Sequence, residues 1–272
     1  MDAAGARSVL AAERPLAGRR VVVTRPRAQA ARFAALLEAY GAEVVALPTI
    51  RLEPPEDWRP LDEALARLSE FEWVVFTSAN GVAAFRARLA RAGRDRTALG
   101  RARVAAIGPE TAQALRTAGI EAEVVPPEYR AEGLAEAMRA RVGPRAAVLV
   151  VRAAEAREVL PEALERLGAR VTVAPAYRTV LVREGAAQVL ALLEARRVDV
   201  VTFTSSSTVR GFMTLAGPEE LRRLLAGVAL AAIGPITAAT LAEYGFQAAI
   251  VPGEYTIPAL AAAIAAYFAP GK

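Results

Sequence analysis

Short apolar runs alternate with helical patterns along most of this chain. The runs that begin at Val21, Trp73 and Val200 read VVVT, WVVFT and VVTFT, without apolar and polar alternation. Such runs are typical of strands buried on both faces of a parallel sheet. Further strands are expected at residues 43–48, 104–107, 122–125 and 147–152, and helices at 28–40, 61–68, 81–92, 110–117 and 132–141. This alternation predicts an α/β fold with helices on both faces of parallel sheets.

The chain also repeats itself at long range. A spacing of 127 positions relates Arg25 to Arg152, Gly41 to Gly168, Pro48 to Pro175 and Thr77 to Thr204. A spacing of 126 relates Gly108 to Gly234 and Tyr129 to Tyr255. One single-residue gap thus covers nearly the whole chain, which indicates one duplicated α/β unit. Taken alone, the duplication predicts two successive domains divided near Pro144.

Composition sets the class of protein. Hydrophobic residues make up 54% of the 272 positions, and no apolar run reaches the roughly 18 residues that span a bilayer. We expect a cytoplasmic monomer with no membrane partner. We also expect residues 1–17 to form a flexible leader before the first domain. The net charge is +5, but the arginines are scattered among glutamates. We interpret them as solvated helix faces and expect no nucleic-acid partner, although an anionic small molecule also suits this charge.

The missing residue types exclude several chemistries. The chain has no Cys and no His, and its one Lys is the final residue, Lys272. Disulfides, thiolate and imidazole catalysis and His or Cys metal sites are therefore excluded, and pyridoxal chemistry is disfavoured. Neither a P-loop nor a dinucleotide-binding glycine motif is present. We expect no cofactor and no metal, and a site made of backbone amides, hydroxyls, Tyr, Arg and carboxylates.

Four turns between a strand and a helix are the candidate binding elements. In open parallel sheets, ligands bind beyond the carboxyl ends of the strands. Each turn has N–H groups at a helix start, where the helix dipole favours an anion. Ordinary helix capping explains any single turn equally well, but two matched pairs favour a bipartite site for carboxylates or phosphates. The candidate residues are Thr77, Ser78, Asn80 and Gly81; Gly108 and Thr111; Thr204, Ser205, Ser206 and Thr208; and Gly234 and Thr237.

Three further positions have side chains with relevant chemistry. Arg25 and Arg152 follow the first strand of each repeat, where each is either a carboxylate ligand or half of a surface ion pair. Tyr177 lies in an extended segment where the other repeat has Ile50, and it is either a proton donor or a packed aromatic residue. We interpret the repeated Tyr129 and Tyr255 as structural.

In the order and spacing of its motifs, the chain resembles the uroporphyrinogen-III synthase family over roughly residues 18–266. The resemblance rests on VVVTRP, VVFTSANGV, AAIGPETAQAL, AYRT, TFTSSSTV and AAIGPITAATL. It implies two flavodoxin-like parallel-sheet domains from a duplicated unit, joined by a two-stranded connector. One domain would comprise residues 18–49 and 180–272, and the other residues 52–175, with connectors at 50–51 and 176–179. Both sets of turns would face the cleft between the domains.

The resemblance also implies a reaction. The substrate would be hydroxymethylbilane, a linear tetrapyrrole with eight carboxylates, which closes with loss of water and inversion of ring D through a spiro intermediate. Tyr177 matches the family tyrosine and would assist the leaving hydroxyl, while the residues of the four turns would bind carboxylates, with Arg25 and Arg152 as further candidates. Holding one folded conformer would be the main catalytic task. The alternatives are a non-catalytic sensor of an anionic metabolite and a sugar-phosphate enzyme.

Overall fold

The structure, a computed structural model, describes residues 14–269. The chain divides into unit 1, Met1–Arg51 with Val180–Lys272, and unit 2, Leu52–Thr179. Most of the predicted leader, residues 1–17, lies outside the described residues. Leu16, however, is fully buried, and its N–H donates to the Tyr40 carbonyl at 3.0 Å. Leu16 is therefore part of the unit 1 core, so the predicted boundary of the flexible leader at residue 17 lies too far along the chain.

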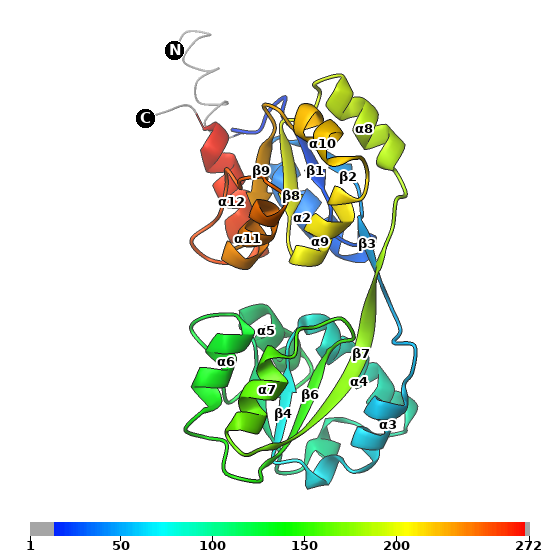
Figure 1. Ribbon diagram of the computed structural model, residues 1–272, viewed down its shortest axis with the longest axis vertical. Helices are drawn as coiled ribbons and strands as arrows, with labels where there is room; N and C mark the ends of the chain where they lie inside the picture. Colours follow the sequence, from blue (N-terminus) through cyan, green and yellow to red (C-terminus); the bar gives the residue numbers. More distant parts are fainter. Residues whose placement is uncertain (1–13, 270–272) are drawn as a thin grey trace. The chain divides into compact units, whose positions relative to one another are not determined.

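Unit 1 is a parallel sheet of four strands in the order β2-β1-β8-β9, with helices on both faces (Figure 1). Val21 and Val23 of β1 pack with α2 and α12 on one face, and Val22 packs with α8, α9 and α10 on the other. This double burial explains why the strands have no polar alternation. The elements are β1 Arg20–Val23, α2 Arg27–Ala39, β2 Glu43–Ala46, α8 Ala186–Glu194, β8 Val200–Phe203, α9 Ser206–Met213, α10 Pro218–Leu224, β9 Ala229–Ala232, α11 Pro235–Glu243 and α12 Ile257–Phe268.

Unit 2 has a five-stranded sheet in the order β3-β7-β6-β4-β5. Val74 and Phe76 of β4 pack with α3, α4 and α5, while Trp73 and Val75 pack with α6 and α7 on the opposite face. The elements are β3 Ile50–Glu53, α3 Arg59–Ala66, β4 Trp73–Phe76, α4 Ala79–Arg91, β5 Arg103–Ala106, α5 Pro109–Thr117, α6 Ala131–Met138, β6 Ala147–Ala153, α7 Val159–Arg166 and β7 Arg170–Leu181. Short 3-10 helices occupy Leu68–Glu70 and Arg96–Leu99.

Each unit combines strands from both repeats. In unit 1, β1 of the first repeat pairs with β8 of the second, and in unit 2, β4 of the first repeat pairs with β6 of the second. The division near Pro144 that the duplication alone predicts is therefore wrong, because Pro144 lies inside unit 2. Strands at equivalent repeat positions take equivalent places in the two sheets.

Core packing repeats along with the strands. Phe76 and Phe85 form an edge-to-face pair with ring centroids 5.1 Å apart, and Phe203 and Phe212, each 127 positions later, form the same pair at 5.4 Å. All four rings are fully buried. Such pairs stabilise by about 0.5–1.5 kcal/mol beyond their burial. Each pair fixes the helix that follows the candidate turn, α4 or α9, onto its strand.

One predicted strand differs from the structure, and the predicted connectors lie within longer strands. The strand expected at residues 122–125 is only an isolated bridge between Ala105 and Val124, because Pro126 and Pro127 follow and cannot donate to a ladder. The predicted connectors at 50–51 and 176–179 are parts of β3 and β7, which are neighbours in the sheet where the chain passes between the units (Figure 1). Within residues 14–269, no helix is long and apolar enough to cross a membrane.

Candidate active site

Tyr177 and the turn after β4 lie together in unit 2. Ser78 is the N-cap of α4, with extended backbone angles of φ −167° and ψ 155°. Its Oγ accepts one hydrogen bond from the N–H of Gly81 at 3.0 Å and another from the Tyr177 hydroxyl at 3.0 Å. A serine hydroxyl has two acceptor lone pairs and one hydrogen, so Ser78 can still donate that hydrogen. The result is a pair of hydroxyls at a helix N-terminus, where the dipole favours negative charge.

A bulge in β7 turns Tyr177 toward this turn. β7 pairs with β6 in register up to Arg152 and Pro175, and the next partners are Ala153 and Tyr177, which leaves Ala176 as an extra residue. Neighbouring residues of a regular strand point to opposite faces. Here Ala176 and Tyr177 both pack against the same hydrophobic cluster. The extra residue therefore redirects the tyrosine, as bulges next to active sites often do.

The Tyr177 phenol is held in its protonated form. Burial raises its pKa above the ordinary value of about 10, hydrogen bonds with Ser78 and Asn80 act in the opposite direction, and the charge of Glu155 adds to the rise. Glu155 is itself fixed, since its carboxylate accepts from the Thr179 N–H at 3.2 and 3.3 Å. Because the net shift is upward, the phenol can donate a hydrogen bond or a proton at neutral pH.

Arg152 lies at the carboxyl end of β6, where it is the strand partner of Pro175. Its side chain is 7% exposed and forms an ion pair with Glu158, while Nη1 donates to the Arg157 carbonyl at 3.0 Å. Its Nε is buried and has no acceptor among residues 14–269. The carboxylate partner expected for Arg152 is thus an internal one, and Glu158, which is 57% exposed, sits where an incoming carboxylate would compete.

The other predicted residues of unit 2 have structural contacts. Thr77 anchors the end of β4 to β6, because its N–H and Oγ1 both donate to the Val151 carbonyl, at 3.3 and 3.5 Å. Gly108 is the N-cap of α5 and is followed by Pro109 at the first helical position. Thr111 is 3% exposed, so its side chain lies beneath the turn and does not line an open surface.

The turn after β8 in unit 1 forms a complete capping box. Ser205 Oγ accepts from the Thr208 N–H at 3.2 Å, and Thr208 Oγ1 accepts from the N–H groups of Ser205 and Thr204 at 3.2 and 3.3 Å. Ser206 Oγ is 2.7 Å from Thr240 Oγ1 on α11. The capping interpretation is therefore correct for Ser205 and Thr208. The N–H groups of Ser206 and Ser207 have no acceptor within the helix by its geometry, and these can bind a ligand.

The remaining predicted positions of unit 1 resemble their counterparts. Gly234 is the N-cap of α11, as Gly108 is of α5, and both have extended backbones. Thr237 is 4% exposed and lies beneath its turn. Arg25 donates from Nη2 to Gln29 Oε1 at 3.2 Å, and it has no acidic residue where Arg152 has Glu158. The two repeated arginines thus differ in their local partners.

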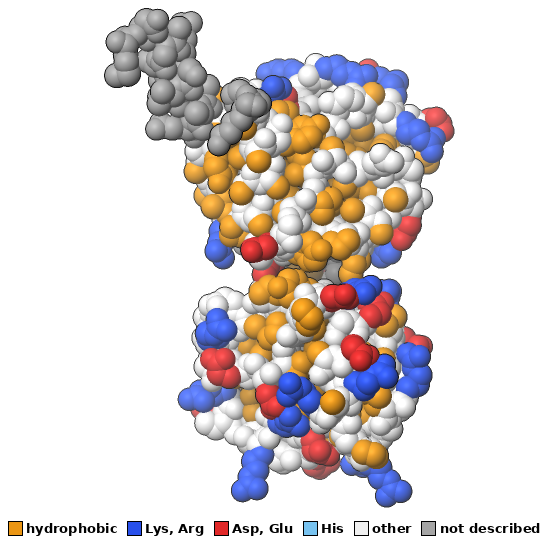
Figure 2. All heavy atoms as spheres, turned by 90° about the vertical axis from the view of Figure 1, so that its left-hand side faces the viewer, with side chains coloured by type: hydrophobic (Ala, Val, Ile, Leu, Met, Phe, Trp, Pro, Cys, Tyr) orange, Lys and Arg blue, Asp and Glu red, His pale blue; other side chains and the backbone are white. Residues whose placement is uncertain are grey.

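Several arginines among residues 14–269 are paired with nearby carboxylates. Arg20 and Glu43 are 2.6 Å apart, as are Arg223 and Glu194. On the face shown in Figure 2, basic and acidic side chains of unit 2 are intermixed. These pairs agree with the interpretation of the arginines as solvated helix faces. The absence of a nucleic-acid partner stays a prediction.

Sequence reasoning missed the acidic residues of this site. Glu155 and Glu158 occupy positions where the other repeat has Ala28 and Ala31, so the duplication gave no signal for them. It also treated Tyr177 as part of a connector outside the turns, whereas the bulge brings the phenol onto Ser78. The extra residue could not be recognised from the sequence, because small side chains such as those of Pro175 and Ala176 are compatible with either face of a strand.

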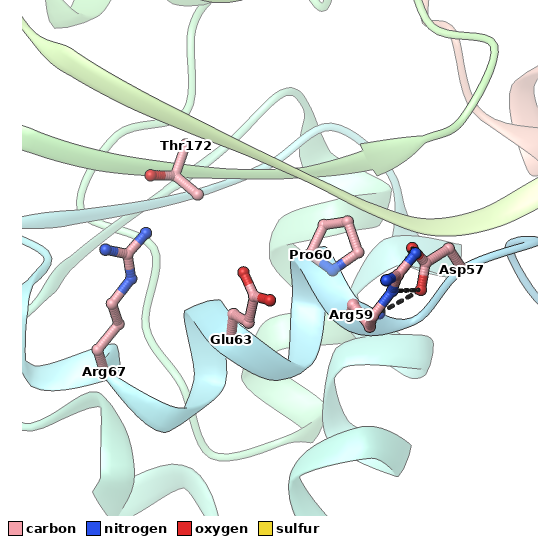
Figure 3. A pocket seen from close by; sticks show the side chains of 6 residues that line it. All are labelled: Asp57, Arg59, Pro60, Glu63, Arg67 and Thr172. Atoms are coloured by element: carbon pink, nitrogen blue, oxygen red, sulfur yellow. Dashed lines mark hydrogen bonds and ion pairs between the residues drawn. The ribbon is translucent and has the colours of Figure 1, made fainter.

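A pocket of about 280 Å³ lies elsewhere in unit 2. Figure 3 shows its lining side chains on α3 and at both of its ends, with Thr172 of β7 above them and Arg59 hydrogen-bonded to Asp57. Thr172 precedes Tyr177 by five residues and so lies toward the amino end of β7. The pocket is lined by Asp57, Arg59, Pro60, Glu63, Arg67 and Thr172, none of which is a predicted site residue. We therefore place the candidate site at the turns and not in this pocket.

Solved structures resemble this fold. A mutant uroporphyrinogen III synthase from the extremely thermophilic bacterium Thermus thermophilus superposes with a TM-score of 0.67, at 23% identity, over 89% of this chain and 95% of that one. The uroporphyrinogen-III synthetase of Helicobacter pylori gives a TM-score of 0.59 at 18% identity, over 92% and 99% of the two chains. At these identities the superpositions establish the fold: mixed α/β with mainly parallel sheets.

Sequence comparison establishes the family. Residues 31–262 match the profile described as Uroporphyrinogen-III synthase HemD. Uroporphyrinogen-III synthase of Synechococcus elongatus is 36% identical over 93% of this chain and 97% of its own length. A putative uroporphyrinogen-III synthase of Methanothermobacter thermautotrophicus is 38% identical over 90% of this chain and 97% of its own. The chain belongs to the uroporphyrinogen-III synthase family.

Proposed function

We propose that this protein cyclises hydroxymethylbilane to uroporphyrinogen III, with Tyr177 acting on the hydroxyl that leaves. The observation that carries this assignment is the hydrogen bond between the Tyr177 phenol and Ser78 Oγ, at the carboxyl end of a parallel sheet. The phenol has a raised pKa, so it is protonated when substrate binds. A hydrogen bond or proton from it stabilises the departing oxygen as the pyrrole electrons expel water.

The other candidate residues bind the eight carboxylates of the substrate in this proposal. The N–H groups at the starts of α4, α5, α9 and α11 supply donors that the helix dipoles favour for anions. Ser78 contributes its remaining hydrogen, and Arg152 becomes a ligand when a carboxylate replaces Glu158. Thr111 and Thr237 act by supporting their turns from beneath, since both are nearly buried. Arg25, Thr204, Gly234 and the α9 serines complete the binding set in unit 1.

The reaction needs no external cofactor in this proposal. Pyrroles supply the electrons, water is the leaving group, and the protein supplies donors and geometry, which makes the enzyme a cyclising lyase. The chain offers no Cys or His, and only the terminal Lys272, to hold a further group covalently or through a metal. We also propose that the enzyme acts as a monomer without nucleic acid.

We further propose that the two units are flavodoxin-like domains that arose from one duplicated segment. The order β2-β1-β8-β9, with Ile250 bridged to Ala231 beyond β9, matches a five-strand doubly wound sheet whose last strand is reduced to one residue. Unit 2 has the equivalent order with Val124 in that place. The boundaries proposed are 18–49 with the segment from 180 onward, and 52–175, with the segments between them as connectors.

The test supplies freshly generated hydroxymethylbilane and separates the product isomers. The wild-type protein should give uroporphyrinogen III, whereas uncatalysed closure gives the symmetrical type I isomer. Tyr177→Phe should lower kcat by about 100-fold at unchanged fold, since general-acid groups contribute at least this much. Tyr244→Phe, at the far end of α11, serves as the matched control. Type I product alone from the wild type would reject the function, and full activity of Tyr177→Phe would reject only the role of the phenol.

A further inference from the structure

Two matched loops expose apolar side chains beside the candidate turns. Val125 and Tyr129 are 41% and 39% exposed in unit 2, and Val251 and Tyr255, 126 positions later, are 43% and 38% exposed in unit 1. Each loop begins right after the residue that forms the isolated bridge to the edge strand. We call residues 125–129 and 251–255 the tyrosine loops. Equal exposure of large apolar side chains at both copies indicates a shared surface role.

Each tyrosine packs directly on the glycine that starts a helix. A Cβ added to Gly108 would lie 3.1 Å from Cβ and 3.2 Å from Cγ of Tyr129. A Cβ added to Gly234 would lie 3.1 Å from Cγ and 3.2 Å from Cδ1 of Tyr255. A Cβ at either glycine would therefore require the tyrosine to shift by a few tenths of an ångström. The exposed part of each aromatic side chain is therefore held next to the first N–H groups of α5 or α11.

We propose that the tyrosine loops bind the pyrrole rings of the substrate. This inference rests on the proposed function and deepens it. A linear tetrapyrrole combines flat, electron-rich, apolar rings with carboxylate side chains, so its binding surface needs apolar contacts close to N–H donors. Val125 with Tyr129 and Val251 with Tyr255 supply the apolar contacts, and the adjacent helix starts supply the donors. Tyrosine gives such contact at a low cost in conformational entropy, because it has only two side-chain torsions.

The strand order in unit 2 places Tyr129 one strand away from the turn that holds the reacting phenol. The Tyr177 hydroxyl reaches Ser78, which follows β4, and Tyr129 packs on Gly108, just beyond the neighbouring strand β5. Adjacent strands are about 4.8 Å apart, so the two turns are side by side. Because the leaving hydroxyl already has its donor in Tyr177, Tyr129 contributes apolar contact to binding and not to the chemical step.

The experiment is steady-state kinetics on Tyr129→Ala and Tyr255→Ala with freshly generated hydroxymethylbilane. We expect each variant to raise KM by about three- to tenfold, with kcat within twofold of the wild type, because aromatic contacts of this kind carry such energies. Tyr129→Phe should keep the wild-type KM. Tyr244→Ala is the matched control, since Tyr244 is 40% exposed at the opposite end of α11 and should change neither constant.

Three outcomes overturn the inference. Unchanged KM in both alanine variants would show that the loops do not touch substrate. A fall in kcat at constant KM would assign the tyrosines to support of the glycine turns. If an alanine variant fails to fold, Val125→Ser and Val251→Ser remove apolar surface without touching either glycine, and an unchanged KM there has the same meaning. A wild type that gives only type I isomer would instead refute the proposed function, so the two failures are distinguishable.

Discussion

At the scale of single residues, the site depends on one phenol that stays protonated. A buried tyrosine loses the hydration that would stabilise its phenolate, so its pKa rises. Ser78 and Asn80 partly offset this effect, and Glu155 adds to it. The sequence identified Tyr177 and Ser78 as candidates, but not their contact. That contact depends on an inserted residue at Ala176, which leaves no mark in the pattern of apolar positions.

Glu155→Gln should lower the pKa of Tyr177. The negative charge of Glu155 disfavours the phenolate, so removing the charge makes deprotonation easier, and the amide can still accept from the Thr179 N–H. Because the protonated phenol is the active form, activity should be lost at a lower pH on the alkaline side than in the wild type. The checks are the pH dependence of kcat/KM and the Cζ chemical shift of 13C-labelled tyrosine. An alkaline limb that does not move would contradict the role of Glu155.

Ser78→Ala and Ser205→Ala separate capping from catalysis. Each serine is an N-cap whose Oγ accepts from the third residue of its helix, so each change should lower the free energy of unfolding by about 1 kcal/mol. Only Ser78 also bonds Tyr177. Ser78→Ala should therefore shift the titration of Tyr177 and lower kcat, while Ser205→Ala should leave that titration unchanged. Equal effects of both variants on the Tyr177 titration would show that the contact has no specific influence.

At the scale of elements, local sequence patterns predicted most strands, turns and helices, because those patterns are strong. The same patterns could not predict how the strands pair, since pairing joins residues far apart and the central strands are apolar on both faces. Nothing in the runs that contain Val21 or Val200 indicates that these two residues are partners. The resemblance to a known family supplied that information, and the capping network around Thr208 became evident only from the structure.

One element-scale difference between the repeats can be tested at Gly211 of α9. A Cβ there would lie 2.6 Å from the Thr49 carbonyl oxygen and 2.9 Å from the Thr49 Cβ, so Gly211→Ala forces α9 away from the segment that follows β2. We expect a net loss of about 1–2 kcal/mol, because overpacking outweighs the roughly 1 kcal/mol that alanine gains in a helix. Position 84 is the counterpart in unit 2 and already holds alanine.

Ala84→Gly is therefore the matched control for Gly211→Ala. It should cost only the propensity difference of about 1 kcal/mol and should not move α4 against its strand. Thermal unfolding measures both variants, and the KM for hydroxymethylbilane reports whether the turn at the start of α9 has shifted. A Gly211→Ala variant as stable as the wild type, with unchanged KM, would show that Thr49 yields easily.

At the scale of the whole molecule, the two units differ in how many chain segments form them, because each unit combines strands from both repeats. Unit 2 is one continuous segment, Leu52–Thr179, whereas unit 1 needs both ends of the chain. Both hydrophobic clusters of unit 2 lie entirely within its segment, and so do the strands β4 to β6 and most of β7. The segment that forms unit 2 is therefore complete before β8 begins, whereas the sheet of unit 1 also needs β8 and β9.

A fragment of residues 52–179 should consequently fold alone. Its length of about 130 residues is typical of an independent domain, and it retains four parallel strands with helices on both faces. A fragment that ends at Arg166 loses β7, which lies inside the sheet, and should not fold.

Residues 1–51 joined to 180–272 by a short linker should fold as well, because the Val182 N–H donates to the Thr49 carbonyl at 3.0 Å and the cut ends are neighbours. Cooperative thermal unfolding and dispersed amide resonances would confirm each folded fragment. An unfolded 52–179 fragment would show that unit 2 depends on unit 1 for its stability, and that strand exchange couples the two in folding.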